Sequence, residues 1–155
     1  MLLVPYHTDS EPNPITRCSM EWLKAFAMLV GRILLVSIFV NSGMSKIGNF
    51  AGTAQYMAKA GMPYTSFFLF GAICFEIIGS LTVILGFLTR LGTTLLLIFL
   101  IPTTLIFHEN FSDHGQMIHF MKNVSIFGGL LILLAVGPGQ LSLDYLFGGR
   151  ERRRK

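Results

Sequence analysis

The feature that most constrains the fold is a 22-residue apolar stretch from Ser66 to Phe87, which carries one ionisable residue, Glu76, near its middle. A helix needs about 20 apolar residues to cross the hydrocarbon core of a bilayer, so this stretch is long enough to span one. A charge at the centre of a span costs roughly 2.5 to 3.5 kcal/mol on the mildest insertion scale. The stretch therefore predicts a transmembrane helix in which Glu76 has a polar partner inside the protein.

Composition extends this prediction to the whole chain. Of the 155 residues, 52% are hydrophobic and only 13% are charged, and the mean hydropathy is +0.62. The apolar runs are rich in Leu, Ile and Phe and show no alternation, which favours helices over a β-barrel. The sequence predicts an all-α membrane protein, a four-transmembrane-helix bundle built as one domain. The expected spans are residues 25–45, 66–87, 91–107 and 123–143.

Polar segments flank and join these spans. Residues 1–21 contain three prolines and are predicted to be a flexible N-terminal lead. The transmembrane domain is expected over residues 22–147, followed by a basic cytoplasmic tail at 148–155. A short helix on the membrane surface is expected between the first two spans, because four apolar residues recur there at helical spacing: Phe50, Ala54, Met57 and Ala58.

Charge near the spans predicts the orientation. Four spans place both termini on one side of the membrane, where eight Lys and Arg residues lie near the spans, against three on the other side. The positive-inside rule then predicts that both termini are cytoplasmic. Five of the eight are in the C-terminal tail, which we interpret as a topology signal rather than a nucleic-acid-binding arm.

Arg32, in the first span, is the expected partner of Glu76. At 1.5 Å per residue, Arg32 lies roughly 10 Å above the expected start of its span at Ala25, and Glu76 roughly 16 Å above Phe87. The two depths differ by about one helical turn, which an arginine side chain can bridge. We therefore predict a buried Arg32–Glu76 pair between the first two spans, and both a structural and a functional role for it stay open.

A second group of polar residues is expected at the outer ends of the spans. Lys46 ends the first span, His108 ends the third, and Lys122 and Asn123 open the fourth. Neutral imidazoles near carboxylates can bind a metal or move protons. The histidine spacing matches no zinc pattern and the two cysteines form no CxxC, so no metal site and no thiol relay are predicted.

The order of these residues resembles the DoxX family of small bacterial membrane proteins. The resemblance extends from Gly31 to Leu146 and rests on the following residues in this order: Gly31-Arg32, Ser42-Gly43, Lys46, Glu76-Ile-Ile-Gly79, Leu85-Gly-Phe-Leu-Thr-Arg90, His108 and Lys122-Asn123. It implies a multi-pass four-helix bundle in the bacterial inner membrane. Some relatives are subunits of quinone-linked oxidoreductases and others belong to oxidant-defence assemblies, whereas distant relatives are cargo receptors and assembly chaperones.

Two interpretations of function follow from the resemblance. In the first, the protein is an accessory membrane subunit of a quinone-dependent oxidoreductase. Its quinone-binding or proton-route residues would then be Arg32, Lys46, Glu76, His108, Lys122 and Asn123. No intrinsic cofactor is expected, so a bound quinone with a soluble oxidoreductase or another membrane subunit would supply the redox chemistry. In the second, it is a non-enzymatic adaptor, chaperone or lipid-binding protein. Both interpretations expect contact with the lipid bilayer and allow a homo-oligomer, and neither involves nucleic acid.

Overall fold

The chain is a bundle of helices, seen in a computed structural model that describes residues 14–107 and 114–152. These residues form the helices α1 (Pro14–Gly48), α2 (Phe50–Lys59), α3 (Thr65–Leu85), α4 (Thr89–Phe107), α5 (His114–Val136) and α6 (Leu143–Arg152). Within this part of the chain, α1, α3, α4 and α5 are long and apolar enough to cross a membrane. The predicted all-α fold with four spans is therefore confirmed.

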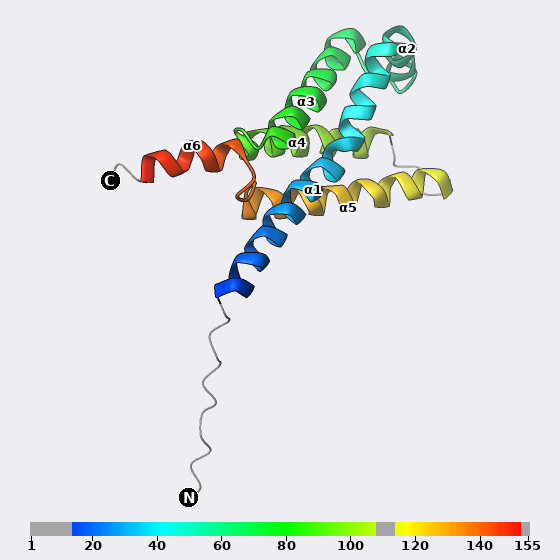
Figure 1. Cartoon of the computed structure of the whole chain (residues 1–155). Coiled ribbons are helices and arrows are strands. Elements are labelled where there is room, and N and C mark those ends of the chain that lie inside the picture. The colour runs from blue at the N-terminus through cyan, green and yellow to red at the C-terminus, as the bar shows by residue number, and fades with distance from the viewer. Residues whose placement is uncertain (1–13, 108–113, 153–155) are drawn as a thin grey trace, which may run out of the picture.

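The bundle has two ends, which are formed by different segments of the chain (Figure 1). The start of α1, the turn between α3 and α4, and the end of α5 with α6 lie at one end, which we call the terminal end. The end of α1 with α2, the start of α3, the end of α4 and the start of α5 lie at the other, which we call the loop end. The prediction that the terminal end faces the cytoplasm stays a prediction.

Two helices differ in extent from the predicted spans. Helix α1 begins at Pro14, inside the lead predicted over residues 1–21, and proline fits there because the first helical turn needs no N–H donor from it. Helix α5 begins at His114, so the expected polar loop is partly helical. It ends at Val136 rather than near residue 143, because Gly137 takes a φ of 86° and Pro138 cannot continue the helix.

The short helix expected after the first span is α2. The Asn49 side chain caps its start by accepting a hydrogen bond from the Gly52 N–H at 3.3 Å. Met57, one of the four apolar residues that predicted the helix, is buried. Helix α2 packs against α3 and so covers the loop end of the bundle.

Helices α3 and α4 form a tight hairpin in which glycine allows the backbones to approach. A Cβ atom on Gly79 would lie 2.9 Å from the Leu96 side chain, and one on Gly92 would lie 2.9 Å from the Gly79 carbonyl oxygen. Gly86 ends α3 with a φ of 65°, and the N–H groups of Gly86 and Phe87 close the helix by donating to Val83 and Thr82. Gly79 and Gly92 therefore set the packing distance between α3 and α4.

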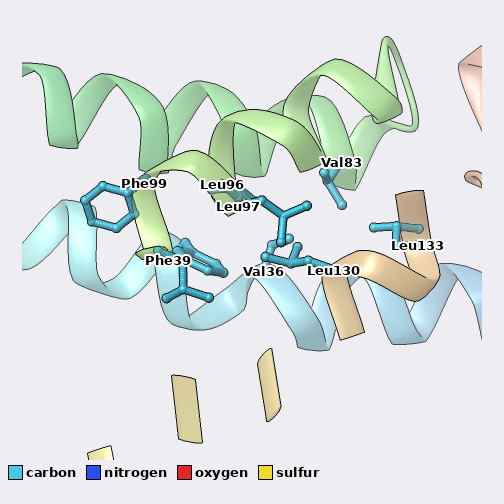
Figure 2. Close-up of a cluster of buried hydrophobic side chains, with 9 residues drawn as sticks. Val36, Phe39, Val83, Leu96, Leu97, Phe99, Leu130 and Leu133 are labelled. Carbon is cyan, nitrogen blue, oxygen red and sulfur yellow. The ribbon is translucent and has the colours of Figure 1, made fainter. Parts of the chain in front are cut away.

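The apolar core lies where the four long helices meet (Figure 2). Its buried side chains come from all four of them: Val36 and Phe39 on α1, Val83 on α3, Leu96, Leu97, Phe99 and Leu100 on α4, and Leu130 and Leu133 on α5. The rings of Phe39 and Phe99 meet edge to face at 6.5 Å. This core fixes how α1 and α4 sit beneath the polar residues at the loop end.

Candidate functional site

The polar centre of the bundle is an ion pair between Lys46 on α1 and Glu76 on α3. Lys46 Nζ lies 2.9 Å from each carboxylate oxygen of Glu76, and it also donates to the Ser42 hydroxyl. Glu76 is only 1% exposed, so its charge lies inside the protein. The two helices come together here because of Gly43, where an added Cβ would lie 2.8 Å from the end of the Ile77 side chain.

The Arg32–Glu76 pair predicted from the sequence does not form. Arg32 is 2% exposed, but its guanidinium lies against Gly86 at the terminal end and donates to the Leu141 carbonyl oxygen. Gly86 lies at the end of α3, ten residues after Glu76. The two residues are therefore roughly 15 Å apart along the helix axis, at 1.5 Å per residue. The prediction failed because it placed Ala25 level with Phe87, whereas Arg32 itself lies level with Gly86 and α1 continues past the end of α3.

At the terminal end, Arg32 and Asp144 hold the chain after α5 against the α3–α4 turn. The Asp144 carboxylate accepts hydrogen bonds from the Leu88 N–H at 2.8 Å and from the Thr89 N–H and hydroxyl at 3.0 and 2.8 Å. It thereby caps the start of α4 from a distant part of the sequence. The Asp144 N–H donates to the Gly86 carbonyl oxygen at 2.7 Å. Arg32 thus helps to hold this end of the bundle together, and its Nε and Nη1 atoms are buried without a hydrogen-bond partner among the described residues.

The electrostatics of Asp144 agree with that structural role. Partial burial raises the pKa of its carboxyl. The hydrogen bonds from Thr89 and Leu88 and the nearby charge of Arg32 lower it by more, so the pKa lies below the ordinary value for aspartate. Asp144 is therefore ionised at neutral pH in the folded protein.

A cavity of about 150 Å³ lies beside the Lys46–Glu76 pair, toward the loop end. Its wall combines the Glu76 carboxylate and the polar groups of Ser42, Thr103, Lys122 and Asn123 with apolar side chains of α1, α4 and α5. The apolar part of the wall is formed by Ile38, Phe39, Phe99, Leu100 and Ile126. Polar and aromatic residues therefore converge on one small space. We call it the polar cavity.

The far wall of the polar cavity is formed by α5. The Asn123 amide N–H donates to the Thr104 hydroxyl at 3.0 Å, and that hydroxyl donates to the Leu100 carbonyl oxygen at 2.7 Å. This arrangement leaves one amide N–H and the side-chain oxygen of Asn123 available to another molecule. Lys122 Nζ lies 3.2 Å from His119 Nδ1 on the exposed side of α5. Lysine and histidine thus connect the cavity with the surface at the loop end.

Four of the six predicted site residues come together in this way: Lys46, Glu76, Lys122 and Asn123. Arg32 lies at the opposite end of the bundle, and His108 lies outside the described residues. Sequence reasoning did not identify Ser42 and Thr103 as cavity residues. Ser42 could have been found, because it lies four residues before Lys46 and so on the same face of α1. Within the described part of the chain, no three His, Cys, Asp or Glu residues are placed to hold a metal ion.

Comparison with known proteins gives consistent matches. A sequence model of the DoxX family matches residues 27–109. The chain is 40% identical over 127 residues to the inner membrane protein YqjF of Escherichia coli strain K12, a match that covers 82% of this chain and 96% of YqjF. It is 38% identical over 122 residues to the inner membrane protein YphA of the same organism, covering 76% of this chain and 87% of YphA. No solved structure matches the chain.

Proposed function

The chain belongs to the DoxX family and is an integral protein of the bacterial inner membrane, and from this premise we propose that it is the membrane subunit of a quinone-linked redox assembly. In this proposal the polar cavity binds the ring of the quinone. The observation that carries the proposal is the juxtaposition of a buried ion pair with a small cavity lined by hydrogen-bond donors and aromatic rings.

The residues of the polar cavity fit a quinone ring in size and chemistry. Ligand pockets for whole drug-sized molecules are roughly 300 to 1,000 Å³, so a cavity of about 150 Å³ suits only a small ring or head group. The two carbonyl oxygens of a quinone accept hydrogen bonds, and Lys122 and Asn123 offer N–H donors from the α5 wall of the cavity. Phe39 and Phe99 provide apolar faces between them.

Residues of the polar cavity can also bind and transfer protons. A bound quinone takes up two electrons and two protons to become a quinol. Glu76 can hold a proton beside the cavity, and Lys122 with His119 can relay protons from the loop end. The sequence contains no CxxC motif, and we propose that a soluble oxidoreductase or another membrane subunit supplies the electrons.

A binding measurement tests the proposal. The purified protein in lipid nanodiscs is titrated with a tail-less benzoquinone, and the same titration is made with Asn123→Leu, which removes the amide donor but keeps the number and branching of the side-chain heavy atoms. We expect saturable binding that weakens about tenfold in this variant, which corresponds to the loss of one hydrogen bond of roughly 1.4 kcal/mol. The matched control is Asn41→Leu on the exposed face of α1, for which no change is expected.

Two results would contradict the proposal. One is the absence of saturable quinone binding to the wild-type protein, and the other is equal affinity in the wild type and Asn123→Leu. Mass spectrometry of material purified in mild detergent provides an independent check, because a redox subunit should retain quinone or an oxidoreductase. Retention of unrelated membrane proteins without quinone would instead favour the adaptor or chaperone interpretation.

A further inference from the structure

An apolar groove lies directly beside the polar cavity. Its volume is about 180 Å³, and it is lined only by side chains of α4 and α5, namely Leu100, Ile101, Thr104, Leu105, Asn123, Val124 and Phe127. Most of these side chains are hydrocarbon, and Ile101, Leu105 and Val124 are exposed on the surface of the bundle. Because α4 and α5 are candidate spans, this surface faces the acyl chains of the membrane.

The groove and the polar cavity share two residues, Leu100 and Asn123. The hydrogen bond from Asn123 to Thr104 joins α5 to α4 at their common boundary. The two spaces are therefore adjacent. The polar cavity has a wall of polar and apolar residues, whereas the groove is lined mainly by apolar residues.

Helix α4 is weakened at the same level. Pro102, between the residues that line the two spaces, has no N–H to donate and so removes one backbone hydrogen bond from the helix. The hydroxyls of Thr103 and Thr104 bond back to the Phe99 and Leu100 carbonyl oxygens at 2.9 and 2.7 Å. Pro102 is therefore the position at which α4 can bend.

We infer that the groove receives the apolar chain of the ligand whose ring occupies the polar cavity, and that this ligand enters sideways from the bilayer between α4 and α5. The inference rests on the proposed function and narrows the ligand to an amphipathic quinone with a hydrocarbon tail. A cavity of about 150 Å³ leaves the tail outside, and the groove is the apolar space that continues from it. Asn123 and Thr104 form the gate between the two.

A comparison of tailed and tail-less quinones tests this inference. Both are titrated into nanodiscs, and affinities are expressed per lipid so that partitioning into the bilayer is removed from the comparison. In the wild type we expect the tailed quinone to bind at least tenfold more tightly. In Val124→Trp, where the indole fills the groove, we expect this advantage to disappear.

The matched control is Ile132→Trp, which places the same indole at a more exposed position on α5, outside the groove. This variant should still bind the tailed quinone at least tenfold more tightly than the tail-less one. Equal preference for the tailed quinone in Val124→Trp and in the wild type would overturn the inference, as would loss of binding of both quinones in Val124→Trp.

Photolabelling keeps the test independent of whether Val124→Trp folds. A quinone with a photoreactive group in its tail should label residues 100–105 and 123–127 of the wild-type protein, and labelling elsewhere would overturn the inference. A photoreactive fatty acid separates the two proposals. If the fatty acid labels these segments while no quinone binds, the groove holds an acyl chain and the proposed function fails. If the tail-less quinone binds but the tailed probe labels other helices, only the present inference fails.

Discussion

Lys46 Nζ lies 2.9 Å from both carboxylate oxygens of Glu76, where α1 crosses α3 inside the bundle. The ammonium makes a further hydrogen bond to Ser42 and lies 5.6 Å from the centre of the Phe99 ring. A charge that is buried this deeply is tolerated because its partner is present. The two residues therefore act as a unit, both in stability and in what they offer to a ligand.

Substitution of Lys46 alone should strongly destabilise the folded protein. Lys46→Met leaves the Glu76 charge without its partner, and breaking a buried pair in this way costs about 3 to 5 kcal/mol. Unfolding in mixed micelles measures the loss. The control is Lys24→Met, because Lys24 forms an exposed pair with Glu21 at 3.1 Å that contributes about 1 kcal/mol or less. Equal effects of the two substitutions would show that the Lys46–Glu76 pair is not buried as described.

Substitution of Arg32 should destabilise the terminal end locally and leave ligand binding in the polar cavity unchanged. Arg32→Gln removes the guanidinium that holds the Leu141 carbonyl, so hydrogen exchange should rise in α6 and in the residues before it. Binding of a tail-less quinone should be unchanged, because Arg32 lies at the opposite end of the bundle from the cavity. A folded Arg32→Gln protein with lost quinone binding would contradict the structural role given to Arg32.

Asp144 should make stability depend on pH. Its pKa is lower in the folded protein than in the unfolded chain, so its contribution is present above the ordinary aspartate pKa and is lost as the pH falls through the folded value. Asp144→Asn should cost about 1 kcal/mol at pH 7, because it removes the negative charge at the start of α4 and weakens the hydrogen bonds that this charge accepts. The difference from the wild type should shrink below about pH 4. Thermal unfolding from pH 7 to pH 3 measures this, and a constant difference over that range would contradict it.

Gly86 should not tolerate a side chain. Its φ of 65° costs an L-residue about 1 to 2 kcal/mol, and a Cβ there would also lie 2.9 Å from the Ser142 Cα. Gly86→Ala should therefore destabilise the protein by at least that amount in an unfolding titration. Gly128→Ala is the control, because no atom lies within 4 Å of a Cβ at that helical position. A neutral Gly86→Ala would show that the turn is not packed as described.

The sequence indicated which residues share a helix face better than it indicated how deep each residue lies in the bundle. Arg32, Val36, Phe39 and Gly43 share one face of α1 by their helical spacing in the sequence, and all four are buried in the structure. The predicted depth of Arg32 in the bundle was wrong, because hydropathy does not show where a helix continues past the apolar segment. The first helix extends through polar residues to Pro14, and the chain after α5 supplies the partners of Arg32.

The candidate site was predicted in part for the same reason. Lys46, Lys122 and Asn123 lie near the ends of predicted spans, so topology alone placed them at one end of the bundle. The partner of Glu76 depended on how α1 and α3 are shifted along each other, which is set by the close contact at Gly43. No pattern in a single sequence gives that shift, and Arg32 was the more conspicuous candidate because it lies inside an apolar run, whereas Lys46 follows the end of one.

The double variant Lys46→Met with Glu76→Met tests the central claim most directly. Replacing a buried ion pair by apolar residues of similar volume is often neutral or stabilising, so the double variant should unfold close to the wild type. If the pair serves to bind the quinone ring, this folded protein should have lost saturable binding of a tail-less quinone in nanodiscs. A stable double variant that binds the quinone with wild-type affinity would contradict the account.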